Sequence, residues 1–282
     1  MKYLSAILLV LIFISGSIQA KNINIKHTLA DVPKEKYQLG LLKLALSYDT
    51  ENTYNFQSSA TAFTQSKLES ALESKQLDVI WLGSNKEYEK RFRAIRVPLY
   101  KGLLGHRVFI IKQGQQAKFD TINSLDALKQ LKAGQGRTWS DTAILQNAGL
   151  PVVTTNKYEN LFYMLEGERF DYFPRGVHEP WSEVIDYAEL DLTVEDKLLL
   201  IYPLPAYLFV HKNNIQLADK IEAGLLQAIE DGSFDDYFYN NPMIKAVLDK
   251  ANLAERTVFR IKNPNLPADT PFNDDRLWYK LK

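Results

Sequence analysis

The chain has 282 residues, its 34 lysines and arginines balance 34 aspartates and glutamates, and 46% of its residues are hydrophobic. A neutral chain with interspersed signs lacks the basic surface that binds nucleic acid or an anionic membrane, so we expect a small molecule or a protein as its partner. The absence of cysteine excludes disulfides, thiolate metal sites and cysteine nucleophiles. The apolar content can fill the core of one large domain or two lobes, which excludes a disordered chain.

The N-terminal segment has the layout of a secretory signal peptide. Lys2 is followed by an apolar run over 4–14 and then by small and polar residues up to Ala20. A membrane-spanning helix needs about 20 apolar residues in succession, and this run is shorter. We expect cleavage after Ala20, although Ile18 stands where a small residue is usual, and a mature protein in the periplasm that begins at Lys21.

Short apolar runs alternate with stretches of helical periodicity along the mature chain, which predicts a mainly parallel sheet covered by helices. Strands are expected at 77–82, 107–111, 135–138, 171–173, 198–201 and 207–210. Apolar residues at helical spacing over 158–165 and 215–229 predict helices that pack on the sheet. Pro264, Pro267 and Pro271 predict an irregular C-terminal tail along the body of the protein.

Three successive segments carry a family resemblance: YLFVHKNN at 207–214, LADKIE at 217–222 and AIEDGSF at 228–234. Their order resembles the last part of the amino-acid-type periplasmic solute-binding proteins (family 3), where a hinge strand precedes a helix that ends in Asp-Gly-Ser/Thr-aromatic. Gly232 is suited to end such a helix in the left-handed conformation. Other segments resemble the same family in the expected order, so the resemblance covers nearly the whole mature chain: LDVI at 77–80, RVPLY at 96–100 and GERFDY at 167–172.

The resemblance implies an α/β fold of the type II periplasmic-binding class, with two lobes joined by a two-strand hinge. Residues 1–20 would then be the signal peptide, 21–104 with 204–282 lobe one, and 105–203 lobe two. A monomer is expected, with a small polar, carboxylate-bearing ligand such as an amino acid between the lobes. An ABC transporter permease would receive the ligand, or a membrane signalling protein would sense it. Nothing in the resemblance calls for a cofactor.

Candidate ligand contacts in and near lobe one follow from strand ends and from the first crossing. Trp81 ends a predicted strand, where it forms either a wall for the ligand or part of the core. The charges over 86–96 form either a solvated helix face or part of the site. The resemblance implies a carboxylate-gripping arginine about a dozen residues after Asp78, a count that leads to Lys90 or Arg91, and a guanidinium at Arg91 can hold a carboxylate through two parallel bonds. Tyr100 and Arg107 flank the crossing, where a side chain can contact both ligand and hinge.

Candidate contacts in lobe two follow two other predicted strands. Trp139 precedes a predicted helix and can stack on a ligand or pack in the core, and Asp141 either caps that helix or meets an ammonium group. Arg175 points at a ligand anion or pairs with Glu179 or Glu183. The family's usual acceptor for an amino group is missing near Arg175, so Glu179 or Asp141 replaces it, or the ligand has no amine.

An enzyme is the weaker interpretation, because the sequence has no G-x-S-x-G, no H-E-x-x-H and no P-loop. The four histidines are scattered singly, and no motif predicts a metal site: His27, His106, His178 and His211. A periplasmic hydrolase stays a minor alternative to the two binding functions, transporter carrier and sensory receptor.

Overall fold

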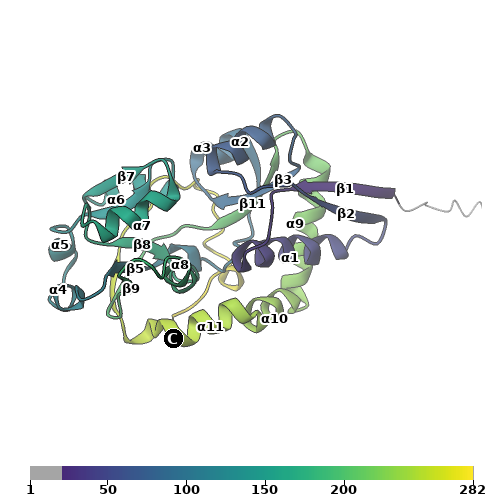
Figure 1. The fold of residues 1–282 in the computed structure, drawn as a ribbon. Coiled ribbons are helices and arrows are strands. Elements are labelled where there is room, and N and C mark those ends of the chain that lie inside the picture. The colour runs from purple at the N-terminus through teal and green to yellow at the C-terminus, as the bar shows by residue number, and fades with distance from the viewer. Residues whose placement is uncertain (1–20, 282) are drawn as a thin grey trace, which may run out of the picture.

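The computed structural model describes residues 21–281, so the predicted signal peptide lies outside the described residues. Figure 1 shows two lobes side by side, each with a sheet and its own helices. Along residues 21–281 there is no helix with the length and apolarity to cross a membrane. The expected combination of sheets flanked by helices is confirmed.

The first lobe is built around β11, which runs antiparallel to both of its neighbours β3 and β4. Strands β1 and β2 pair in parallel over their full length, and a hydrogen bond of 2.9 Å from Asp78 N to Lys26 O joins β1 to the start of β3. The elements of this lobe are β1 (Lys21–His27), α1 (Pro33–Ser47), β2 (Asn52–Ser58), α2 (Gln65–Glu73), β3 (Val79–Gly83), α3 (Lys86–Arg91), β4 (Phe92–Ile95), β11 (Ala206–His211) and α9 (Ile215–Glu230).

The second lobe has the strand order β12-β10-β5-β8, with β9 also paired to β5. The parallel pair β6 and β7 joins this sheet through a bridge between Ala133 and Tyr172, next to β8. The elements of this lobe are β5 (His106–Lys112), α4 (Gln116–Asp120), α5 (Leu125–Leu128), β6 (Ala133–Gly136), α6 (Ser140–Asn147), β7 (Val152–Thr155), α7 (Tyr158–Glu166), β8 (Phe173–Gly176), α8 (Pro180–Asp186), β9 (Leu192–Val194), β10 (Leu198–Ile201) and β12 (Thr257–Arg260).

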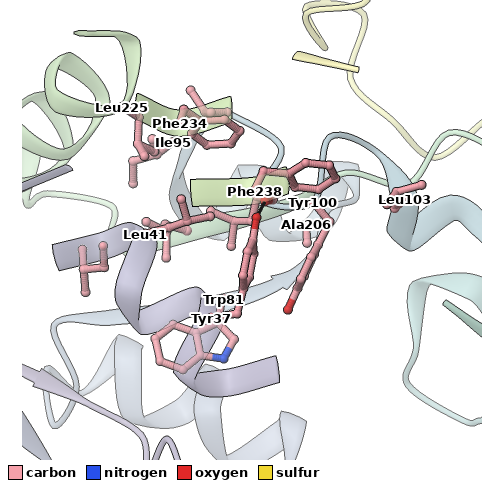
Figure 2. Packing of buried hydrophobic residues seen from close by; sticks show 14 of the residues in the cluster. Tyr37, Leu41, Trp81, Ile95, Tyr100, Leu103, Ala206, Leu225, Phe234 and Phe238 are labelled. Carbon is pink, nitrogen blue, oxygen red and sulfur yellow. Dashed lines mark hydrogen bonds between the residues drawn. The ribbon is translucent and has the colours of Figure 1, made fainter. Parts of the chain in front are cut away.

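The core of the first lobe lies between its sheet and helices α1 and α9. Figure 2 shows Tyr37 beside Tyr100, whose rings stack at 4.9 Å, with Trp81 and Leu41 close by. A Cβ on Gly224 of α9 would lie 1.9 Å from the carbonyl oxygen of Ala45, so the two helices can approach this closely because the residue is glycine. The predicted helical stripe packs here as expected, except for Ile215, which is 53% exposed at the first turn of α9.

Two connections cross between the lobes, at 96–105 and 202–205, and they touch each other. A short 3-10 helix, η1 (Leu103–Gly105), ends the first connection, and a Cβ on Gly105 would lie 1.9 Å from the Tyr202 carbonyl oxygen. Gly102 has φ 78°, which lies in the left-handed region that favours glycine.

The C-terminal segment, residues 252–281, also joins the lobes. It follows α10 (Ser233–Asn240) and α11 (Pro242–Ala251), includes η2 (Leu253–Glu255), β12 and η3 (Asp275–Leu277), and pairs with β10. The segment then returns to the first lobe, where the Asn265 carbonyl accepts a 2.7 Å hydrogen bond from Lys86 N. Trp278 then covers Gly102, where a Cβ would lie 2.6 Å from its ring. The tail is therefore partly a strand rather than wholly irregular.

The two main sheets are mainly parallel, as predicted, and one strand in each runs against the others. Strands β5 and β11 each follow a crossing and enter their sheets against the direction of their neighbours. The six expected strands are present with ends shifted by up to a few residues, and the one at 198–201 agrees at both ends. The residue bounds of the lobes stay a prediction.

Candidate functional site

Two buried arginines stand at the edge of the second sheet that faces the first lobe. Arg107 lies near the start of β5 and Arg175 near the end of the antiparallel strand β8, where Val108 pairs with Arg175. Because side chains alternate along a strand, Arg107 and Arg175 lie on opposite faces of the sheet. Both are 2–3% exposed.

Arg175 is enclosed by aromatic rings and held by two carboxylates. Its Nε donates to Glu183 Oε2 at 2.7 Å, and its Nη2 lies 2.9 Å from Glu179 Oε1. The guanidinium carbon is 5.0 Å from the centre of the Trp139 ring and 5.6 Å from that of Tyr158. Burial by itself would lower the pKa of Arg175, but the two carboxylates outweigh it and raise that pKa, so the guanidinium stays charged.

Arg107 forms the second buried ion pair. Its Nη2 contacts Asp141 Oδ1 in the first turn of α6, and the Tyr202 hydroxyl donates to the same oxygen at 2.5 Å. Within residues 21–281 the buried Arg107 Nε has no hydrogen-bond partner. The N-cap residue of α6 is Trp139, and no side chain makes a capping hydrogen bond there. Asp141 therefore pairs with Arg107 and does not cap the helix.

Glu179 lies beyond the strand ends, where both guanidiniums reach it. Its Oε2 accepts from Gly176 N at 2.9 Å and lies 3.6 Å from Arg107 Nη1. Its Oε1 lies 2.9 Å from Arg175 and 3.6 Å from Lys34 Nζ at the start of α1. Burial works to raise the pKa of Glu179, but Arg175 and the other cations lower it well below its usual range. Glu179 is therefore a buried carboxylate that stays ionised.

The first lobe touches this group of charges directly. The Tyr100 ring stacks on His178 with centroids 4.0 Å apart, and Asn85 Nδ2 donates to Ser140 Oγ at 2.8 Å. Burial lowers the pKa of His178 to about 3, so this ring is neutral at physiological pH. With the Lys34 contact, these pairs bring the lobes together around the cluster of Arg107, Asp141, Arg175, Glu179 and Glu183, which we call the cleft cluster.

The structure brings most of the predicted contacts to the cleft cluster but not all of them. Arg107, Asp141, Arg175 and Glu179 belong to it, Trp139 lies over Arg175, and Tyr100 is joined through His178. Two lie elsewhere: Trp81 packs in the first core at 6% exposure, and Arg91 pairs with Glu69 and Glu73 of α2 at 2.6 and 2.8 Å. The roles of all eight residues stay predictions.

Three residues of this region escaped the sequence analysis. Tyr158, whose hydroxyl donates to Glu183 Oε1 at 2.6 Å, stood in an apolar helical stripe and was assigned to the core. Tyr202 directly follows a predicted strand, which was a usable signal. No signal in the sequence pointed to Lys34, because only the folded chain brings α1 against the second lobe.

Other features of the described residues do not suggest a second chemistry. A cavity of about 330 Å³ lies on the first lobe at β1, β2 and the start of α9, away from the cleft cluster. Within residues 21–281 no group of three or more histidine, aspartate and glutamate side chains is arranged to hold a metal ion.

Comparison with known proteins was made at the level of sequence and of structure. No protein-family model and no curated protein matches the sequence. An ancestral arginine-binding protein superposes with a TM-score of 0.56 at 19% identity over 79% of this chain and 99% of its own. The probable amino-acid ABC transporter extracellular-binding protein of Bacillus subtilis superposes with a TM-score of 0.58 at 17% identity, over 80% of this chain and 100% of its own. The chain has the two-lobed periplasmic-binding-protein fold.

The same fold occurs in a sensor domain. A histidine kinase sensor domain with similarity to periplasmic binding proteins gives a TM-score of 0.53 at 16% identity, over 79% of this chain and 97% of its own. These likenesses confirm the predicted fold class. In α/β sheets, ligands bind at the carboxyl ends of strands, and the end of β8 in this periplasmic-binding-protein fold carries Arg175.

Proposed function

We propose that the chain is an exported solute-binding protein that holds a small polar ligand, an amino acid or a related compound, between its lobes and presents it to an ABC transporter. The cleft cluster carries this proposal, because it buries charged side chains where two lobes meet. Buried charges need partners, and a cleft that opens gives a ligand access to them. The arginine-binding protein and the probable amino-acid ABC transporter binding protein among the structural neighbours support the ligand class.

Ligand capture would work through closure of the two lobes. A ligand shifts an equilibrium between open and closed forms only if it contacts the closed form better. Lys34 and Tyr100 from the first lobe and Glu179 with His178 from the second already meet across the cleft. A ligand that contacts both sides would therefore stabilise closure, which a membrane partner can recognise.

A binding role fits the charge states of the cleft better than catalysis does. Arg175 and the other cations around Glu179 hold the pKa of that carboxylate well below its usual range, whereas a general acid needs a pKa near the working pH. The neighbours named above are binding proteins or a sensor domain, which supports a non-enzyme. The expected signal peptide and these neighbours support a periplasmic location.

A sensory receptor is the second candidate, favoured by the histidine kinase sensor domain among the structural neighbours. Both functions use the same ligand site and differ in the membrane partner. Cross-linking of the mature protein to membranes of its own cell, followed by identification of the partner as a permease or a signalling protein, separates them.

Thermal unfolding with a library of amino acids, organic acids, peptides and sugars tests ligand binding. A ligand at 100 times its Kd stabilises the folded state by about 2.7 kcal/mol, which raises the Tm of a chain of this size by about 5–10 °C. Arg175→Met should reduce the shift, because it removes the guanidinium that positions Glu179 and Glu183 in the cleft cluster, whereas Arg91→Met, which changes an arginine outside that cluster, should keep it. If the Tm stays unchanged with every compound class, the proposal is contradicted.

A further inference from the structure

The three arginines that the sequence predicts as ligand contacts are already matched by carboxylates of the chain. Arg91 is held by Glu69 and Glu73, and Arg107 by Asp141. Arg175 is held by Glu179 and Glu183. No unmatched positive charge therefore marks a place for a ligand's carboxylate at these three arginines.

Glu179 is surrounded in the way a bound carboxylate would be. One oxygen lies 2.9 Å from Arg175 and 3.6 Å from Lys34, and the other accepts from Gly176 N at 2.9 Å and lies 3.6 Å from Arg107. Arginine forks and backbone N–H groups are the usual donors to a small carboxylate. The side chain is 9% exposed, so it fills this position and does not merely border it.

The charges of the cleft cluster also oppose a second anion. Two guanidiniums, Arg107 and Arg175, face three carboxylates, Asp141, Glu179 and Glu183. In a poorly solvated site, like charges repel strongly, and each of the two cations already has its partner. The second lobe's part of this group therefore carries a net negative charge, which Lys34 of the first lobe balances in the structure.

We infer that Glu179 is a specificity-determining residue that fills the anion position between Arg107 and Arg175, so that the cleft disfavours anionic ligands and takes ligands through cationic or neutral polar groups. This inference rests on the proposed function. Lys34, 38% exposed on its side chain, is the group of the first lobe that approaches Glu179. A cationic group of a ligand can replace its ammonium at little cost, because an exposed lysine regains water when it swings away.

Replacement of Glu179 by alanine tests the anion position directly. Glu179→Ala leaves a gap of carboxylate size between two buried guanidiniums, which sodium acetate can fill. The Tm of Glu179→Ala should rise saturably with acetate relative to sodium chloride at equal ionic strength, and the wild-type Tm should not. Glu73→Ala, which removes a carboxylate from Arg91 at the surface, is the matched control and should not respond. An equal acetate response in the wild type, or none in a folded Glu179→Ala, would overturn the inference.

Glu179→Gln covers the case in which the alanine variant does not fold, because it keeps the shape and removes the charge. Its affinity for glutamate should exceed that of the wild type at least about tenfold, a change that corresponds to about 1.4 kcal/mol. Unchanged or weaker affinity contradicts the inference.

The wild-type protein supplies a measurement that needs no variant. Glutamate and glutamine differ by one charge at nearly equal shape. A larger Tm shift with glutamate than with glutamine would therefore also overturn the inference about Glu179. An acetate response confined to Glu179→Ala, with no ligand found in the library, would retain the anion position while the proposed function fails.

Discussion

Removal of Arg107 should destabilise the protein more than any surface change. Arg107→Met keeps a long apolar side chain at a position that is 2% exposed, but it leaves Asp141 with the Tyr202 hydroxyl as its remaining partner. Loss of one partner of a buried ion pair costs about 3–5 kcal/mol, because the other charge stays buried without compensation. For a chain of this size, each kcal/mol lowers the Tm by about 2–4 °C, so a decrease of about 6–20 °C is expected.

The measurement is thermal and urea unfolding followed by circular dichroism, with a double variant as the control. Arg107→Met combined with Asp141→Leu removes both charges and should recover at least half of the lost stability, since an apolar pair of similar volume can replace a buried ion pair. A single variant within about 1 kcal/mol of the wild type would refute the reasoning. A double variant less stable than the sum of both single changes would refute it as well.

Gly105→Ala should lower the free energy of unfolding by about 3 kcal/mol, because its Cβ would lie 1.9 Å from a backbone oxygen of the other crossing. In the same urea titration, Gly83→Ala should change the free energy of unfolding little, because its Cβ would lie 3.4 Å from the nearest atom. Burial depresses the pKa of His178 to about 3 and of His106 to about 4, from 6.5, so the unfolded chain binds more protons, and stability should be full above pH 6.5 and fall toward pH 4. The loss should approach about 1.4 kcal/mol per pH unit for each histidine, and an unchanged slope in His178→Gln would contradict this. Lys34→Met should lower the free energy of unfolding by less than about 1 kcal/mol, because its ion pair with Glu179 is 3.6 Å long and its side chain is 38% exposed. A Tm decrease above about 5 °C would contradict this prediction.

Strands buried on both faces could be predicted from the sequence because they are continuous apolar runs. The run LLLI at 198–201 and the run at 207–210 are such strands, and both are in the structure. The strands β1 and β2 were missed because KNINIKH and NTYNFQS are rich in polar residues, and most of their side chains face solvent. Strand β12 was missed because Thr257–Arg260 lies in a proline-rich tail and pairs only through contacts distant in sequence.

The site could be predicted where it depends on strand ends and not where it depends on partners. The rule that ligand contacts follow strands led to Trp139, Asp141, Arg175 and Glu179, which gather as expected. Spacing taken from the family resemblance led to Arg91, but α3 turns its guanidinium toward α2. No local pattern reveals that an arginine is already paired, because Arg107 and Asp141 meet only after folding.

The C-terminal segment turns a joint of two crossings into one of three. Two adjacent chains resist bending weakly and still permit one lobe to rotate against the other about the line between them. A third link, fixed to β10 on one side and to Lys86, Lys101 and Gly102 on the other, opposes this rotation. Opening would then be confined to a swing about a single axis, or would require the segment from Asn263 onward to detach from one lobe. A fluorophore attached near Lys280 would distinguish the two motions, because only detachment changes its surroundings.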